Sequence, residues 1–525
     1  MGDAHGSQTG EKSPVNDLER LDTRASFVPP SMGVWQRRLT VLSLCITLFL
    51  GALDITIIST ALPSISTHLH VTSREYAWIG SGYNLATTVS SPVWVKLSDI
   101  FGRKPTIMTS ASVFMIGSLV SALAKSSTSL LAGRVVQGLG NGGSTVLVTV
   151  IIGDIFVLAD RAKYYGVTGI AFALASAIGP VLGGIFTDSI GWRWCFYINL
   201  PLDGIGLLLL YFNLNVNIEK ETLTHGLASI DWIGFLLIIG GTICFLYGLE
   251  TGSSGLMAWS SATVILLIVF GALILALFMI WEARFARNPM IPIRIFHRRT
   301  CLAAFTVSCL QVFVYISFDF FLPLYYQVIL GFKPIISGVT LFALIIPMSL
   351  AAFGGGLFIR RTGNYLAVIF MGTSLLTLGT GLFVSFDSNV SWPKIICFEL
   401  IAGIGAGVLF QSPMIALQSH IPQEDTAAAM SAFSFLRNLF TSVSIVVGTV
   451  LIQHTIGSGS LTTTISKDSS GAGRRNQYVT GLRNMWIFYT CVASITILAT
   501  FFIKSNGLKK KDQRESVSSD QSAAD

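Results

Sequence analysis

Charged residues are scarce in this chain. Asp, Glu, Lys and Arg together make up 12% of the 525 residues, while hydrophobic residues make up 52%. A soluble domain carries roughly 25% charged residues. This balance excludes a water-soluble globule and predicts a chain that lies largely within a lipid bilayer.

Other features are missing as well. The seven cysteines include no Cys-x-x-Cys pair, so neither a disulfide framework nor a metal site is predicted. The sequence contains no His-Glu-x-x-His or Gly-x-Ser-x-Gly motif and no nucleotide-binding cassette. We therefore expect no enzyme, no bound cofactor and no ATP-driven pump. The net charge of +7 is assigned to loops at a membrane surface and not to a nucleic-acid partner.

Long apolar runs are what the sequence has in abundance. A run of roughly 18 or more apolar residues is long enough to cross a bilayer as a helix. The runs do not alternate polar and apolar residues as barrel strands do, so helices are predicted. The fold class is an all-α membrane protein with fourteen spans, at approximately 39–63, 76–96, 107–124, 130–154, 165–187, 195–213, 231–250, 261–281, 302–328, 336–359, 365–386, 395–417, 427–452 and 484–503.

These spans divide the chain into two six-helix bundles separated by a linker with two extra helices, and a tail lies at each end. The regions are a disordered cytoplasmic tail (1–38), an N-terminal bundle (39–213), a linker with two inserted transmembrane helices (214–300), a C-terminal bundle (301–503), an external loop within that bundle (453–483) and a second cytoplasmic tail (504–525).

The positions of Lys and Arg predict the orientation. Most of the basic residues fall in loops on one side if the N-terminus is cytoplasmic, as the positive-inside rule requires. An even number of spans then places both termini in the cytoplasm. The Asn389-Val390-Ser391 triplet falls in an outer loop, where glycosylation of Asn389 is possible. Span length does not separate the plasma membrane, which we favour, from a vacuolar membrane.

A repeat relates the two bundles. Gly138, Gly140 and Gly142 recur at Gly403, Gly405 and Gly407, an offset of 265 residues. The turn around Gly102 recurs around Gly363, and the offset of 265 carries Asp54 onto Asp319. We expect the glycines to permit close helix packing.

Asp54 and Asp319 are acids inside predicted spans. An Asp at the centre of a membrane helix costs about 2.5–3.5 kcal/mol and usually faces a bundle interior or a water-filled cavity. We interpret both as proton-coupling residues. The alternative for Asp54 is a structural hydrogen bond to a neighbouring helix, and the alternative for Asp319, which lies between aromatic residues, is a position in an outer vestibule. Arg134 lies in the fourth span and is the expected cation partner of Asp54, with Gln137 one turn further on the same face.

Two stretches are candidates for a conformational gate. In the loop at 95–105, Gly102 permits a tight turn, Asp99 is placed to cap or pair, and Arg103 holds the turn at the membrane surface; an ordinary positive-inside loop is the alternative. Within the span at 165–187, Pro180 kinks the helix. The glycines beside it, which admit a close neighbour, are Gly179, Gly183 and Gly184.

Five motifs in this order resemble the major facilitator superfamily. They are LDITIISTALP (53–63), KLSDIFGRKP (96–105), GRVVQG (133–138), GPVLGG (179–184) and GWRWCFYINLP (191–201). With fourteen spans, the chain is similar to the drug:proton antiporter branch, the fungal-type efflux pumps. The resemblance implies proton-driven export from a central cavity and places Asp54, Asp99, Arg103, Arg134 and Gln137 on motif positions. Val95 and Ala175 depart from the motifs, where glycine is usual.

The predicted mechanism is alternating access, in which two bundles rock around a site at the membrane midplane. The expected partners are a small amphipathic organic molecule, protons and the lipid bilayer, with the chain acting as a monomer. Export or vacuolar sequestration of basic amino acids is the alternative function. The candidate cavity residues are Tyr83, Asn84, Gln137, Tyr315, Phe320, Phe321, Tyr326, Gln327 and Gln411.

Overall fold

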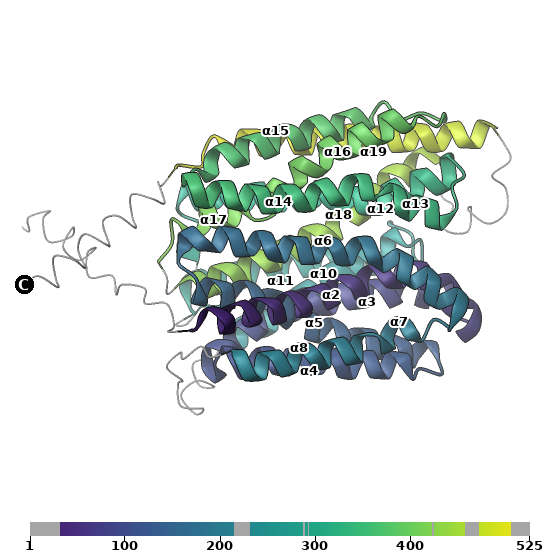
Figure 1. The fold of residues 1–525 in the computed structure, drawn as a ribbon. Coiled ribbons are helices and arrows are strands. Elements are labelled where there is room, and N and C mark those ends of the chain that lie inside the picture. The colour runs from purple at the N-terminus through teal and green to yellow at the C-terminus, as the bar shows by residue number, and fades with distance from the viewer. Residues whose placement is uncertain are drawn as a thin grey trace, which may run out of the picture.

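Long helices lie side by side in the computed structural model of this chain (Figure 1). The structure describes residues 32–214, 231–286, 289–291, 293–422, 425–456 and 472–505. Its helices are α2 (Val34–Leu69), α3 (Ser73–Phe101), α4 (Arg103–Ala122), α5 (Ser127–Ile155), α6 (Leu158–Ser189), α7 (Trp194–Tyr197), α8 (Asn199–Asn213), α10 (Trp232–Ser253), α11 (Ala262–Arg284), η1 (Ile293–Ile295), α12 (Arg299–Leu324), η2 (Tyr325–Ile329), α13 (Pro334–Thr340), α14 (Phe342–Thr362), α15 (Tyr365–Phe383), α16 (Trp392–Leu409), α17 (Ser412–Gln418), α18 (Thr426–Ile456) and α19 (Ala472–Thr500).

The all-α membrane architecture is confirmed. Within the described residues, thirteen helical segments are long and apolar enough to cross a membrane. The predicted span at 76–96 is helical as part of α3, but α3 is not among the thirteen. The reason is that α3 is less apolar, since it directs several hydroxyl groups toward α5. Thr87 Oγ1 donates to the Gly138 carbonyl at 3.1 Å, and Ser91 Oγ donates to the Gly142 carbonyl at 3.2 Å.

Some helix ends differ from the predicted spans. Helix α19 begins at Ala472, inside the loop predicted at 453–483, because its first turns are amphipathic. Tyr478 and Leu482 are buried there, whereas Arg475 and Arg483 are exposed, so a search for apolar runs overlooks them. Helix α2 likewise begins at Val34, within the predicted tail. The rest of both predicted tails, 1–31 and 506–525, and the loop segment 457–471 lie outside the described residues.

The glycine repeat produces the same helix crossing twice. A Cβ atom at Gly138 would lie 2.3 Å from the carbonyl oxygen of Tyr83, and one at Gly403 would lie 2.3 Å from the carbonyl oxygen of Leu344. A Cβ atom at Gly407 would likewise lie 2.1 Å from the carbonyl oxygen of Met348. Helix α5 therefore crosses α3 as α16 crosses α14, at distances that only glycine permits. The predicted close packing and pseudo-symmetry are both confirmed.

The repeat does not have one constant offset. Gly138 and Gly403 are 265 residues apart, but their contacts Tyr83 and Leu344 are 261 residues apart. Gly102, between α3 and α4, and Gly363, after α14, follow this second offset and have φ of 91° and 73°. The predicted tight turn at Gly102 is therefore present, since a left-handed backbone favours glycine.

Neighbouring helices form two groups that meet along α3, α6, α14 and α18. In Figure 1 the purple-to-blue helices α2–α8 lie below the green-to-yellow helices α12–α19, and α6 runs beside α14. Helix α3 also packs against α18. The inserted pair α10 and α11 pack on each other, and α10 touches both α3 and α18. Helix α10 thus contacts both groups.

Candidate functional site

Asp54 lies on α2 and is fully buried, with none of its surface exposed. Its carboxylate forms an ion pair with Arg134 of α5. Two side-chain amides also donate to it, Gln137 Nε2 at 3.0 Å and Asn199 Nδ2 at 3.1 Å. The predicted pairing of Asp54 with Arg134 is therefore present. Burial of two opposite charges is tolerated because each is neutralised by the other and by further hydrogen bonds.

Arg134 has additional partners that hold it in place. Its Nε donates to the carbonyl of Ile79 at 3.2 Å, and its guanidinium lies over the Tyr83 ring, 4.3 Å from the ring centre. Gln137 donates in turn to Ser118 of α4 at 2.8 Å. Because these side chains come from α2, α3, α4, α5 and α8, the network ties together five helices of the first group.

Asp319 of α12 has a different environment. It is only half-buried, and the described residues include no ion-pair partner for it. Tyr315 lies one turn before it and is buried, and its hydroxyl interacts with the Asp319 carboxyl group. Pro323 follows four residues later and has no N–H to offer the Asp319 carbonyl. The chain then continues as the single-turn π-helix η2, a distortion common at functional sites.

The nine residues predicted to line one cavity are spread over several environments. Tyr83 and Gln137 are buried in the Asp54 network, and Tyr326 is buried against Glu399. The ring of Phe321 is buried against Gly448. The half-buried members are Asn84 and Gln411, the exposed members are Phe320 and Gln327, and Tyr315 is buried on α12. A shared role in substrate binding stays a prediction.

Both stretches predicted as gates make tight contacts. Arg103 pairs with Asp99 at 2.6 Å and with Asp154 of α5 at 2.8 Å. On α6, which contains Pro180, a Cβ at Gly179 would lie 2.0 Å from Thr56 Oγ1 and one at Gly183 would lie 2.2 Å from Thr60 Oγ1. Gly184 differs, because no atom lies within 4 Å of an added Cβ. The glycines at 179 and 183 thus bring α6 against α2.

The sequence comparisons identify the family. Residues 44–445 match the sequence profile of the Major Facilitator Superfamily. The chain belongs to this superfamily. It is 41% identical over 492 residues to a protein named efflux pump dotC from Dothistroma septosporum, covering 90% of this chain and 84% of that one. It is 38% identical over 503 residues to the MFS-type transporter ppz2 of Metarhizium majus, covering 91% and 86%.

The fold agrees with this assignment. A solved structure of the proton:xylose symporter XylE superposes with a TM-score of 0.60, covering 90% of this chain and 98% of that one, at 14% sequence identity. The likeness is therefore one of fold. This member of the superfamily is a multi-pass membrane transporter and not an enzyme.

The sequence reasoning missed several ionisable residues in the membrane helices of this transporter, among them Glu399, Asp203 and Arg437. Glu399 of α16 is fully buried; one carboxylate oxygen accepts from the Tyr326 hydroxyl and the other has no partner. Asp203 of α8 is also buried, with one oxygen unpartnered. Arg437 lies on α18. The rule that selected Asp54, an ionisable residue inside an apolar run, would have selected all three.

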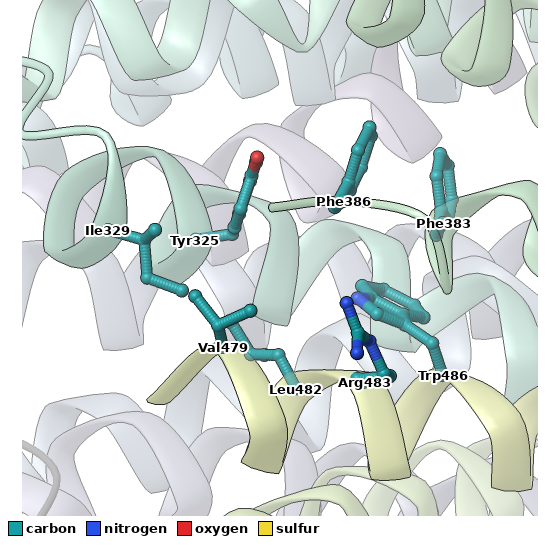
Figure 2. Close-up of a pocket in the computed structure, with 8 residues that line it drawn as sticks. All are labelled: Tyr325, Ile329, Phe383, Phe386, Val479, Leu482, Arg483 and Trp486. Atoms are coloured by element: carbon teal, nitrogen blue, oxygen red, sulfur yellow. The ribbon is translucent and has the colours of Figure 1, made fainter. Parts of the chain in front are cut away.

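A small cleft lies apart from these residues. Figure 2 shows that side chains from η2, α15, the loop after α15 and α19 surround it, with Arg483 beside the indole of Trp486. It is lined by Tyr325, Ile329, Phe383, Phe386, Val479, Leu482, Arg483 and Trp486. None of the predicted site residues lines this cleft, so it is not assigned to transport.

Proposed function

We propose that this transporter exports small amphipathic organic molecules and is driven by protons that enter in exchange. The observation that carries the proposal is the 41% identity, over 90% of the chain, to a protein named an efflux pump. The acids within the membrane supply the chemistry. Neutralising a carboxylate with a proton removes most of the cost of burying it, so the proton state of such a residue biases which conformation is stable.

Alternating access is proposed to occur between two bundles, residues 39–213 and 301–503, with 214–300 as an inserted linker. Contacts at one end of the structure hold the bundles together. Asp160 pairs with Arg360 at 2.6 Å, Arg161 Nη1 donates to Gln418 Oε1 at 3.3 Å, and Gln418 Nε2 donates to the Tyr165 hydroxyl at 2.9 Å. With the termini in the cytoplasm, this arrangement is a state closed to the cytoplasm.

The environments of the two aspartates suggest different roles. A proton that binds Asp54 must compete with Arg134 and two amide donors, whereas Asp319 is half-buried and has no cation partner among the described residues. We therefore propose that Asp319 exchanges protons with the outside. Asp54 and Arg134 are proposed to support coupling by holding the first bundle as one body, rather than by direct exchange at each cycle.

Vesicle transport tests this division of roles. A substrate is first found by accumulation screening, with and without a protonophore, in a host that lacks its own exporters. Asp319→Asn is expected to abolish transport driven by a pH gradient while substrate exchange across the membrane persists. Asp54→Asn is expected to lower both, together with the amount of folded protein. Asp387→Asn, in the half-exposed loop after α15, is the matched control.

Full gradient-driven transport by the Asp319→Asn variant would refute its proton role. If Asp54→Asn instead lost only gradient-driven transport and stayed folded, the proton role would move to Asp54. A wild-type chain that is indifferent to protonophores would refute proton drive altogether.

Basic amino acids are the second candidate substrates, because a reachable acid without a cation partner, such as Asp319, suits a cationic substrate. Uptake of labelled lysine into isolated vacuoles would support that function. The proposed location is the plasma membrane with both termini in the cytoplasm, and the vacuolar membrane is the alternative. Asn389 is exposed in the loop before α16, as glycosylation on the outer face requires.

A further inference from the structure

Arg437 of α18 is an arginine in the interior of a membrane-spanning helix, and α18 packs against both groups of helices. It lies 11 residues after the first residue of α18, or about 16 Å along the axis at 1.5 Å per residue. Ionisable residues at such depth usually face a bundle interior or an aqueous cavity and mark a substrate or ion pathway. The mechanism above does not use this cation.

The partners of Arg437 are neutral. Its Nη1 donates to Ser308 Oγ at 2.8 Å and to Gln311 Oε1 at 3.1 Å. The guanidinium lies over the rings of Phe410 and Phe433, at 5.0 Å and 5.6 Å from the ring centres. No carboxylate of the described ranges pairs with it. This contrasts with Arg134, whose charge is matched by Asp54.

Part of the guanidinium is left available. Arg437 is half-buried, and its Nε and Nη2 make no hydrogen bond with any described residue. Neither atom is among the fully buried polar atoms without a partner, so both keep some accessible surface. Two adjacent N–H donors of one guanidinium form the planar fork that binds a carboxylate in a bidentate manner.

The surroundings fit an aromatic ligand at the boundary between the two groups of helices. Phe410 contacts Phe172 of α6, with ring centres 5.6 Å apart. Phe410 and the half-buried Gln411 lie where α16 ends and α17 has not yet begun. Transporter sites near the midplane are typically formed at such interruptions of a helix.

Polar residues continue from Arg437 toward Asp319 along one face of α12. Ser308, Gln311, Tyr315 and Asp319 are spaced by three, four and four residues, which places them on the same side of a helix. Gln311 and Asp319 are eight residues apart, or about 12 Å. Asp319 is therefore too far from Arg437 to neutralise its charge. A ligand bound at Arg437 and a proton bound at Asp319 would occupy neighbouring positions along one face of α12.

Resting on the export function above, we propose that Arg437 binds the acidic group of the substrate and that the exported compounds are aromatic or amphipathic monoanions, such as carboxylates and phenolates. Nε and Nη2 hold the anion, and Phe410 and Phe433 contact the apolar part. A positively charged substrate is disfavoured at this position by like-charge repulsion.

Three probes of one shape test this assignment on the purified full-length chain: 1-naphthoate, 1-naphthamide and 1-naphthylmethylammonium. Binding is measured by calorimetry. Wild type is expected to bind the carboxylate at least tenfold more tightly than the ammonium compound. Arg437→Gln should weaken naphthoate binding at least tenfold and change naphthamide binding less than threefold, while Arg437→Lys retains part of the preference. Arg483→Gln, which removes an exposed arginine of the second group, should change none of the three.

Equal affinity for the three probes, preference for the ammonium compound or no binding of naphthoate overturns the proposal. So does an equal loss for all three probes in Arg437→Gln, since that pattern indicates a structural role. If Arg437→Gln does not fold, the proposal is judged on two other results. These are the preference of the wild-type protein for naphthoate and the part of that preference that the Arg437→Lys variant retains. Proton-driven export of a screened compound is measured in a separate experiment. If the protein shows no preference for the anion but still exports, only the anion-binding proposal is refuted. If export is absent, the proposed function itself is refuted.

Discussion

Removing either member of the Asp54–Arg134 pair should destabilise this transporter strongly. Both side chains are essentially inaccessible, at 0% and 1% exposure. Deleting one partner of a buried ion pair leaves an uncompensated charge and costs about 3–5 kcal/mol. Asp54→Asn and Arg134→Gln are each expected to lower the free energy of unfolding by that amount. Because Asn is close in shape to Asp, the loss of unfolding free energy in Asp54→Asn reflects the missing negative charge and not a change in packing.

The double variant should recover much of this loss. With both charges gone, no ion is left buried, and a neutral replacement of a buried pair is often tolerated. We expect Asp54→Asn/Arg134→Gln to be destabilised by no more than about 3 kcal/mol, which gives a coupling energy of about 3 kcal/mol or more in a double-mutant cycle. The assay is equilibrium unfolding of purified protein in mixed micelles by SDS titration, followed by tryptophan fluorescence.

The Asp160–Arg360 pair is the matched control. Its atoms lie 2.6 Å apart, but the side chains are 36% and 43% exposed, so solvent screens the charges. The same cycle on that pair should give about 0–1 kcal/mol. A coupling energy at Asp54–Arg134 as small as that of the exposed pair would refute the reasoning, because it would mean that the buried charges are neutralised or solvated in another way.

Two further predictions concern packing and a buried acid. Gly407→Ala should destabilise by about 1–3 kcal/mol, because the new Cβ meets the Met348 carbonyl at 2.1 Å, whereas Gly184→Ala, with open space around it, should be neutral or slightly stabilising in the same titration. A loss of equal size at both positions would contradict the packing argument. Tyr326→Phe removes the described hydrogen bond of Glu399, whose second oxygen is already unpartnered, and should cost about 1–3 kcal/mol. An unchanged unfolding free energy would show that water or another group satisfies Glu399.

Much of the fold follows from local features of the sequence. Apolar runs predicted the spans well because a helix in lipid must satisfy its own backbone hydrogen bonds. The same rule was weaker at α3 and at the start of α19, where polar side chains face other helices or water. Glycine spacing predicted the crossings at Gly138 and Gly403, since only glycine lets two helix backbones approach so closely.

The sequence alone determined which residues are ionisable inside the membrane and that Arg134 was the natural partner for Asp54. Only the tertiary structure decided that Asp54 is fully buried and ion-paired, whereas Asp319 is partly exposed and has no ion pair among the described residues, although a repeat offset had made them look equivalent. It also decided that Arg437 has neutral partners. The physical reason is that the charge state and accessibility of a side chain depend on what distant helices place against it, and spacing along one helix does not contain that information.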